Sequence, residues 1–206
     1  MKTAILIFDG LTALDAIGPY EVLRSVPGWE VEFVAKSAGE IRAESGHLGL
    51  SADRSLEEVG AADILLVPGG KGNRPLLEDE EVLSWLRRLD AGSTWTTSVC
   101  TGSLVLGAAG LLKGKRATGH WLYLEHLRAF GAEPVESRYV EDGKLITAAG
   151  VSAGIDMALH LVGRVAGPEA AQKVQLAIEY DPSPPFDAGS PQKAPAAIVE
   201  ALSGRS

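Results

Sequence analysis

The residue best suited to covalent chemistry is Cys100, the single cysteine of the chain. It follows residues 94–99, a short β-branched run that predicts a buried strand, and precedes residues 101–111, whose leucines and small residues predict a helix. A nucleophile on such a turn stands at the carboxyl end of a sheet, where α/β proteins bind ligands. The first N–H groups and the dipole of the helix favour a thiolate. The turn predicts a reactive thiol, although residue type alone favours an inert core cysteine.

Asp15, within residues 14–19, is the second candidate. One interpretation is a helix N-cap, because an Asp side chain accepts N–H bonds at helix starts. The loop after the first parallel strand, however, reaches the same sheet edge as Cys100. A protonated carboxylic acid at that place donates a hydrogen bond to the sulfur, which raises the pKa of the acid and lowers the pKa of the thiol. The pair then combines a nucleophile with a neighbouring proton donor.

Gly69 and Gly70 end another predicted strand, residues 63–67. They either relieve strain in a turn or present a backbone N–H to developing negative charge, together with the N–H of Thr101. A phosphate cradle is disfavoured, because the chain has neither a GxGxxG motif nor the Walker spacing.

His120 follows a predicted strand end and could approach Cys100. No histidine directly follows the cysteine, which disfavours a Cys-His protease dyad. Trp121 and Tyr123 either line a pocket or pack in the core. Neither an HExxH motif nor paired Cys/His spacing is present, so the sequence predicts no metal site.

The elements that position these residues alternate between strand and helix along the chain. We expect strands at residues 4–8, 29–35, 63–67 and 94–99, helices at 15–25, 79–89, 121–130, 153–165, 168–178 and 196–202, and hairpins at 37–52 and 138–147. Pro19 is expected in the first turn of its helix. This alternation predicts one domain, residues 1–206, with a doubly wound parallel sheet and helices on both faces. An irregular, proline-rich tail from about residue 181 is expected to wrap over the surface.

Composition limits the partners and the compartment. The net charge of −8 disfavours nucleic acid, because phosphate backbones are bound by clustered Lys and Arg. The N-terminal apolar run is too short for a signal peptide, and no stretch approaches the length of a membrane span. We therefore expect a cytoplasmic protein that contacts neither nucleic acid nor membranes.

Four motifs resemble the ThiJ/PfpI superfamily in order and spacing. They are Ser98-Val99-Cys100-Thr101-Gly102, Val67-Pro68-Gly69-Gly70, Leu14-Asp15-Ala16-Ile17-Gly18-Pro19 and Arg116-Ala117-Thr118-Gly119-His120-Trp121. Within the superfamily the chain is most similar to bacterial isocyanide hydratases, including Gln175-Leu176-Ala177-Ile178-Glu179-Tyr180 and residues 184–191. The resemblance implies a flavodoxin-like fold, a homodimer, and neither a metal nor an organic cofactor. It also implies Cys100 as nucleophile, Asp15 as acid/base, Thr101 as a hydrogen-bond donor and Gly70 as a backbone donor.

The resemblance implies hydration of an isocyanide to an N-substituted formamide through a thioimidate on Cys100. Ile17 occupies a position at which we expect Thr in hydratases. The difference removes a hydroxyl near the site, so the sequence does not specify which substrate is used. Glyoxalase-like or deglycase-like activity and oxidant sensing are the alternatives, although that branch has Glu where this chain has Asp15. A ligand-sensing module of AraC-type regulators is a further alternative; residues 196–206 offer too little helix for the helix-turn-helix that such a regulator needs.

Overall fold

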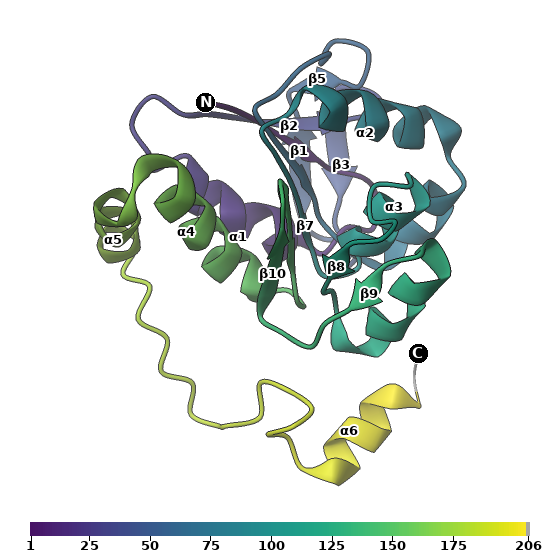
Figure 1. The fold of residues 1–206 in the computed structure, drawn as a ribbon, viewed down its shortest axis with the longest axis vertical. Coiled ribbons are helices and arrows are strands. Elements are labelled where there is room, and N and C mark those ends of the chain that lie inside the picture. The colour runs from purple at the N-terminus through teal and green to yellow at the C-terminus, as the bar shows by residue number, and fades with distance from the viewer. Residues whose placement is uncertain (205–206) are drawn as a thin grey trace.

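A seven-stranded sheet forms the centre of residues 1–204, the part of the chain that this computed structural model describes (Figure 1). The strand order is β10-β11-β7-β6-β1-β2-β5, and β10 is antiparallel to β11 while the other neighbours pair in parallel. The strands are β1 (Lys2–Leu6), β2 (Glu30–Ala35), β5 (Arg54–Ser55), β6 (Ile64–Val67), β7 (Trp95–Val99), β10 (Tyr139–Asp142) and β11 (Leu145–Ala148).

Helices cover both faces of this sheet (Figure 1). On one face α1 packs against α4, and α4 against α5; α2 and α3 lie on the opposite face. Their bounds are α1 (Ala13–Leu23), α2 (Glu80–Gly92), α3 (Gly102–Ala108), α4 (Ala153–Ala166) and α5 (Pro168–Ala177). The doubly wound, flavodoxin-like fold expected from the sequence is therefore confirmed.

The strand order explains where a ligand site should form. From β1 the chain moves outward to β2 and β5, then returns to the other side of β1 with β6, β7 and β11. The order thus reverses between β1 and β6, and α/β sheets bind ligands at the carboxyl ends of strands beside such a reversal. Asp15, Gly69 and Cys100 all follow the carboxyl ends of strands at or next to this point.

The middle of the sheet is the core. The apolar runs in β1 and β6 are fully buried, as expected of parallel strands covered on both faces. Trp85 of α2 is also buried, and its Nε1 donates to the Val59 carbonyl at 2.9 Å. The strands that carry the candidate site are therefore held in a tightly packed layer.

Several predicted elements differ in detail. The first helix begins at Ala13 rather than near Asp15, so Pro19 lies inside the helix and not in its first turn. A tertiary contact sets that start, because the N–H of Thr12 donates to the Gly69 carbonyl at 2.9 Å. The helix predicted over 121–130 forms with those bounds as a 3-10 segment, η2 (Trp121–Phe130), which ends at left-handed Gly131. A second 3-10 segment is η1 (Lys71–Leu77).

The first predicted hairpin forms, but as a separate two-stranded sheet of β3 (Gly39–Arg42) and β4 (Gly49–Ala52) rather than as an edge of the main sheet. Another small sheet pairs β8 (Arg116–Ala117) with β9 (Glu133–Pro134). The tail leaves α5 and extends beside the body before ending in α6 (Ala196–Ser203), so most of it does not wrap over the surface as expected (Figure 1). No helix within residues 1–204 has the length and apolar character to cross a membrane.

Candidate active site

Cys100 occupies a strained turn between β7 and α3. Its φ is 61°, in the left-handed region that non-glycine residues adopt at a cost of about 1–3 kcal/mol. Its N–H donates to the carbonyls of Ala148 and Ala149, both at 3.1 Å, at the end of the neighbouring strand β11. The Ser103 hydroxyl donates to the Cys100 carbonyl at 3.1 Å. Both backbone polar groups of the turn are thus bonded, which holds the sulfur in one place.

The turn also depends on a close approach between α3 and β6 at Gly102. A Cβ added to Gly102 would lie 2.1 Å from the Val67 carbonyl oxygen, so α3 would have to move away from β6. We expect Gly102→Ala to lower the free energy of unfolding by about 3 kcal/mol, the upper part of the range for overpacking. Gly92→Ala is the matched control, since a Cβ there would meet nothing within 4 Å. Urea unfolding of both variants checks this; equal stabilities would contradict it.

Asp15 lies in the first turn of α1 and is completely buried. Its Oδ2 accepts the N–H of Gly69 at 2.9 Å, so the carboxyl bonds to the neighbouring loop and does not cap its own helix. Its Oδ1 makes no hydrogen bond of ordinary geometry within residues 1–204, while the carboxyl interacts with the Cys100 thiol. Burial raises the pKa of Asp15 from its ordinary 3.8 to about 7, against the lowering effects of Gly69 and Cys100.

The pKa of Cys100 moves in the direction opposite to our expectation. Burial first, and then the negative charge of Asp15, raise the pKa of the thiol from 9.0 to about 12. The N–H groups of Thr101 and Val151 lower it, but by less. The expected effect of the helix N-terminus on the sulfur is therefore present and is outweighed by burial, since the residue is only 5% exposed.

Taken together, Asp15 and Cys100 are a coupled pair. The Asp15 carboxylate disfavours a thiolate on Cys100, whereas the neutral thiol favours the carboxylate, so between the two transitions the pair holds one proton, which the carboxyl and the sulfur share between them. A proton can pass between them without a third group. Such a pair supplies a nucleophile, a general acid and a general base from two side chains.

Gly69, Gly70 and Thr101 lie together beside this pair. The N–H of Gly70 donates to Thr101 Oγ1 at 3.1 Å, and the N–H of Gly69 is taken by Asp15. These glycine N–H groups therefore hold the site residues rather than pointing freely toward a substrate. A Cβ on Gly69 would lie 2.5 Å from the Thr101 nitrogen and 3.0 Å from the Cys100 Cβ, so glycine permits the close approach.

Ile17 and His120, the other two predicted site residues, do not interact with the Cys100 sulfur as Asp15 does. Ile17 is half-buried on α1, two positions after Asp15, and residues at that spacing do not share a helix face. His120 is the N-cap of η2, and its Nδ1 accepts the N–H of Leu122 at 3.3 Å. The His120 ring lies against Gly150, where an added Cβ would meet it at 2.6 Å, and burial lowers the pKa of this histidine.

Sequence reasoning missed two residues of the site. Val151 has a φ of 42° and directs its N–H to the sulfur. Asn73 is buried, and its Nδ2 donates to the Thr101 carbonyl at 3.1 Å. The signal for Val151 was available, because it follows the carboxyl end of β11, which pairs in parallel with β7. No comparable pattern marks Asn73.

Within residues 1–204, no three His, Cys, Asp or Glu side chains gather closely enough to hold a metal ion. A cavity of about 570 Å³ lies beside the site, with His120 and Val151 among its lining residues.

Comparison with known proteins agrees with this geometry. The model of the DJ-1/PfpI family matches residues 1–164. The chain is 48% identical over 200 residues to a Pseudomonas putida protein named isonitrile hydratase, covering 97% of this chain and 87% of that protein. It is 31% identical to the transcriptional regulator CdhR of Pseudomonas aeruginosa, covering 82% of this chain but 52% of the regulator. A crystal structure of a ThiJ/PfpI family protein from Pseudomonas syringae superimposes with a TM-score of 0.96 at 39% identity, covering 99% of this chain and 85% of that one.

Proposed function

The chain belongs to the DJ-1/PfpI family, and from this membership and the Asp15–Cys100 pair we propose that it hydrates isocyanides to N-substituted formamides. The observation that carries the proposal is the burial of one carboxyl against the single cysteine of the chain. The similarity to a protein named isonitrile hydratase supports the same reaction. Cys100 is the nucleophile, Asp15 the acid and base, and Thr101 a backbone donor to the sulfur.

The first half of the reaction joins the thiol to the substrate. Asp15 takes the thiol proton as the sulfur forms a bond to the terminal carbon of the isocyanide. Asp15 then gives that proton to the same carbon. The product is a thioimidate, in which the former carbon–nitrogen triple bond has become a double bond. The N–H groups of Thr101 and Val151 stabilise the negative charge that passes through the sulfur.

The second half releases the formamide. Asp15, again a carboxylate, takes a proton from water while the water oxygen bonds to the thioimidate carbon, and passes this proton to the nitrogen. The carbon–sulfur bond then breaks as a carbonyl forms. The remaining hydroxyl proton returns to the Asp15–Cys100 pair, which regains its single proton. The net change is the addition of one water molecule, with no oxidant, reductant or cofactor required.

The pH dependence follows from the coupled pair. Below pH 7 the raised pKa of Asp15 leaves both the carboxyl and the thiol protonated, so no base can take the thiol proton. We expect kcat/KM to fall about tenfold for each pH unit below about 6 and to level off above about 8. A pH series of initial rates between 5 and 9 measures this. A rate independent of pH over that range would contradict the role of Asp15 as base.

The reaction class is tested by supplying two electrophiles in parallel. With p-nitrophenyl isocyanide we expect the corresponding formamide, carrying one oxygen atom from labelled water, as detected by mass spectrometry. With methylglyoxal we expect no consumption above the rate of a Cys100→Ala control. Consumption of methylglyoxal alone would replace the proposal with glyoxalase-like or deglycase-like activity.

A further inference from the structure

We propose that the C-terminal arm, residues 181–203, forms one wall of the substrate pocket and selects isocyanides with a bulky, uncharged aryl group. This inference rests on the proposed hydration reaction. It concerns the cavity of about 570 Å³, a volume within the range of pockets that hold drug-sized ligands. The lining residues that carry the argument are His120, Trp121, Leu124, Val151, Pro191 and Gln192.

The cavity lies next to the nucleophile. Val151 contributes to its lining and also directs its N–H to the Cys100 sulfur. Gly119 is a second connection, because it lines the cavity and a Cβ there would lie 3.0 Å from the Cys100 carbonyl oxygen. A substituent carried by an isocyanide bound at the sulfur can therefore extend into this space.

The part of the arm that forms this wall is a hydrogen-bonded turn. Residues 189–192 line the cavity, and this turn is closed by the N–H of Ala194 donating to the Ser190 carbonyl at 2.9 Å. An ion pair between Lys193 and Asp187 spans the same turn at 2.7 Å. Where the arm begins, the Tyr180 hydroxyl donates to Asp156 of α4 at 3.0 Å.

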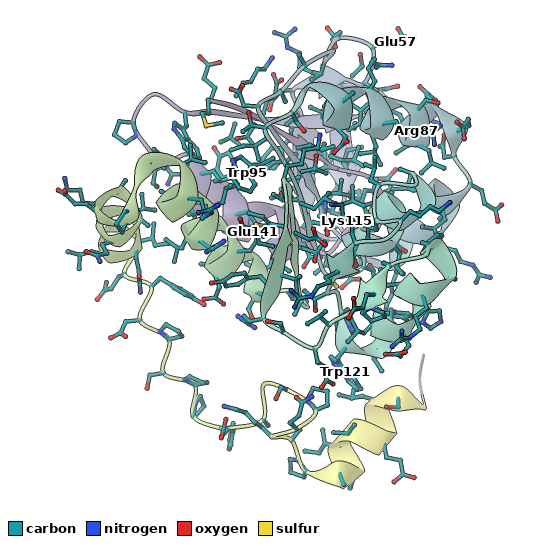
Figure 2. The ribbon with its side chains drawn as sticks, viewed as in Figure 1. Glu57, Arg87, Trp95, Lys115, Trp121 and Glu141 are labelled. Carbon is teal, nitrogen blue, oxygen red and sulfur yellow. The ribbon has the colours of Figure 1, made fainter. Side chains whose placement is uncertain are left out.

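The far end of the arm also contacts the body. Trp121 lies beside the arm, at the edge of the body that faces α6 (Figure 2). Ile198 and Leu202 of α6 line a small cavity together with Trp121. The indole is thus shared between the substrate cavity and the arm, which places the arm at the cavity wall.

The chemistry of the lining defines the substituent. Trp121, Leu124 and Val151 present apolar surface, and burial lowers the pKa of His120, which favours the neutral form of its ring. The charged lining residues are Glu136 and Arg138, both exposed, and Arg138 Nε is paired with Asp156 at 2.6 Å. An anionic substituent would lie near Glu136 while Arg138 is already paired, and a cation would have to leave water for a mostly apolar lining, whereas an aryl group can stack on Trp121.

The test compares a bulky with a small substrate. We expect Gln192→Trp, which fills the cavity from the arm, and Trp121→Ala, which removes the aromatic wall, each to lower the ratio of kcat/KM for 2-naphthyl over tert-butyl isocyanide at least tenfold. Ser183→Trp is the matched control, because it adds the same side chain to an exposed position of the arm away from the cavity. The control should keep the ratio within twofold of the parent protein. An unchanged ratio in both cavity variants would overturn the inference.

A binding measurement separates this inference from the reaction. In a Cys100→Ala background, N-(2-naphthyl)formamide should bind saturably, as measured by calorimetry, and Gln192→Trp should weaken that binding at least tenfold. If the parent protein hydrates neither isocyanide while the formamide still binds in this way, the proposed reaction is wrong and the pocket assignment holds. Equal binding to the Gln192→Trp and Ser183→Trp variants would reject the pocket assignment whatever the reaction.

Discussion

Cys100→Ala is expected to abolish isocyanide hydration, with kcat lowered on the order of 10⁴-fold or more. The proposed reaction forms a bond to the sulfur, and no other cysteine is present to replace it. Cys100→Ser should be similarly inactive, because a buried hydroxyl beside an ionised carboxyl is a far poorer nucleophile than a thiol. Initial rates with p-nitrophenyl isocyanide measure the loss.

The control for this variant lies two residues before Cys100, in strand β7. Ser98 is fully buried on β7, and within residues 1–204 its hydroxyl makes no hydrogen bond, so Ser98→Ala removes a polar group without breaking a contact. We expect Ser98→Ala to retain at least half of the parent rate. Full activity of Cys100→Ala would refute the mechanism, and equal losses in both variants would indicate damage to the strand.

Asp15→Asn is expected to lower kcat about 10³-fold while the fold persists. The amide keeps the size of the carboxyl, and its oxygen can still accept the N–H of Gly69. It cannot take the thiol proton or return it to carbon, so both halves of the reaction are slowed. Asp9→Asn is the matched control in the loop just before α1, where the carboxylate accepts the N–H of Arg42 at 2.8 Å. An Asp15→Asn enzyme as active as the Asp9→Asn enzyme would contradict the acid/base role.

The same variant has an expected effect on stability. Because the pKa of Asp15 is higher in the folded than in the unfolded chain, its own contribution to stability is greatest below about pH 4 and is lost as the pH rises through about 7. The rise from 3.8 to about 7 corresponds to roughly 4 kcal/mol. Asp15→Asn, which is uncharged at every pH, should therefore be more stable than the parent at pH 8 and similar to it at pH 4. Urea unfolding at both pH values tests this; an identical difference at the two would contradict it.

Much of the site could be predicted because it depends on a general property of parallel sheets. The turns after β1, β6 and β7 meet at one edge, so Asp15, Gly69 and Cys100 were expected together and the structure brings them together. The order of strands and helices could also be predicted, because the spacing of apolar residues differs between a buried strand and an amphipathic helix.

The remaining features depend on packing that a local pattern does not encode. The helix N-terminus predicts a lowered thiol pKa, but the direction is reversed by burial and by Asp15, which come from other segments. Val151 reaches the sulfur from the end of β11 with a backbone conformation that valine rarely adopts. The course of the arm beside the body likewise depends on contacts far along the chain, such as Tyr180 with Asp156.

The most direct test of the account is rapid mixing with an isocyanide followed by acid quenching and peptide mass spectrometry. We predict that the peptide containing Cys100 gains the mass of one isocyanide, and that this adduct forms at least as fast as the formamide appears. Formamide production with Cys100 unmodified at every time point, or with the added mass on another residue, would contradict the central claim that this sulfur attacks the isocyanide carbon.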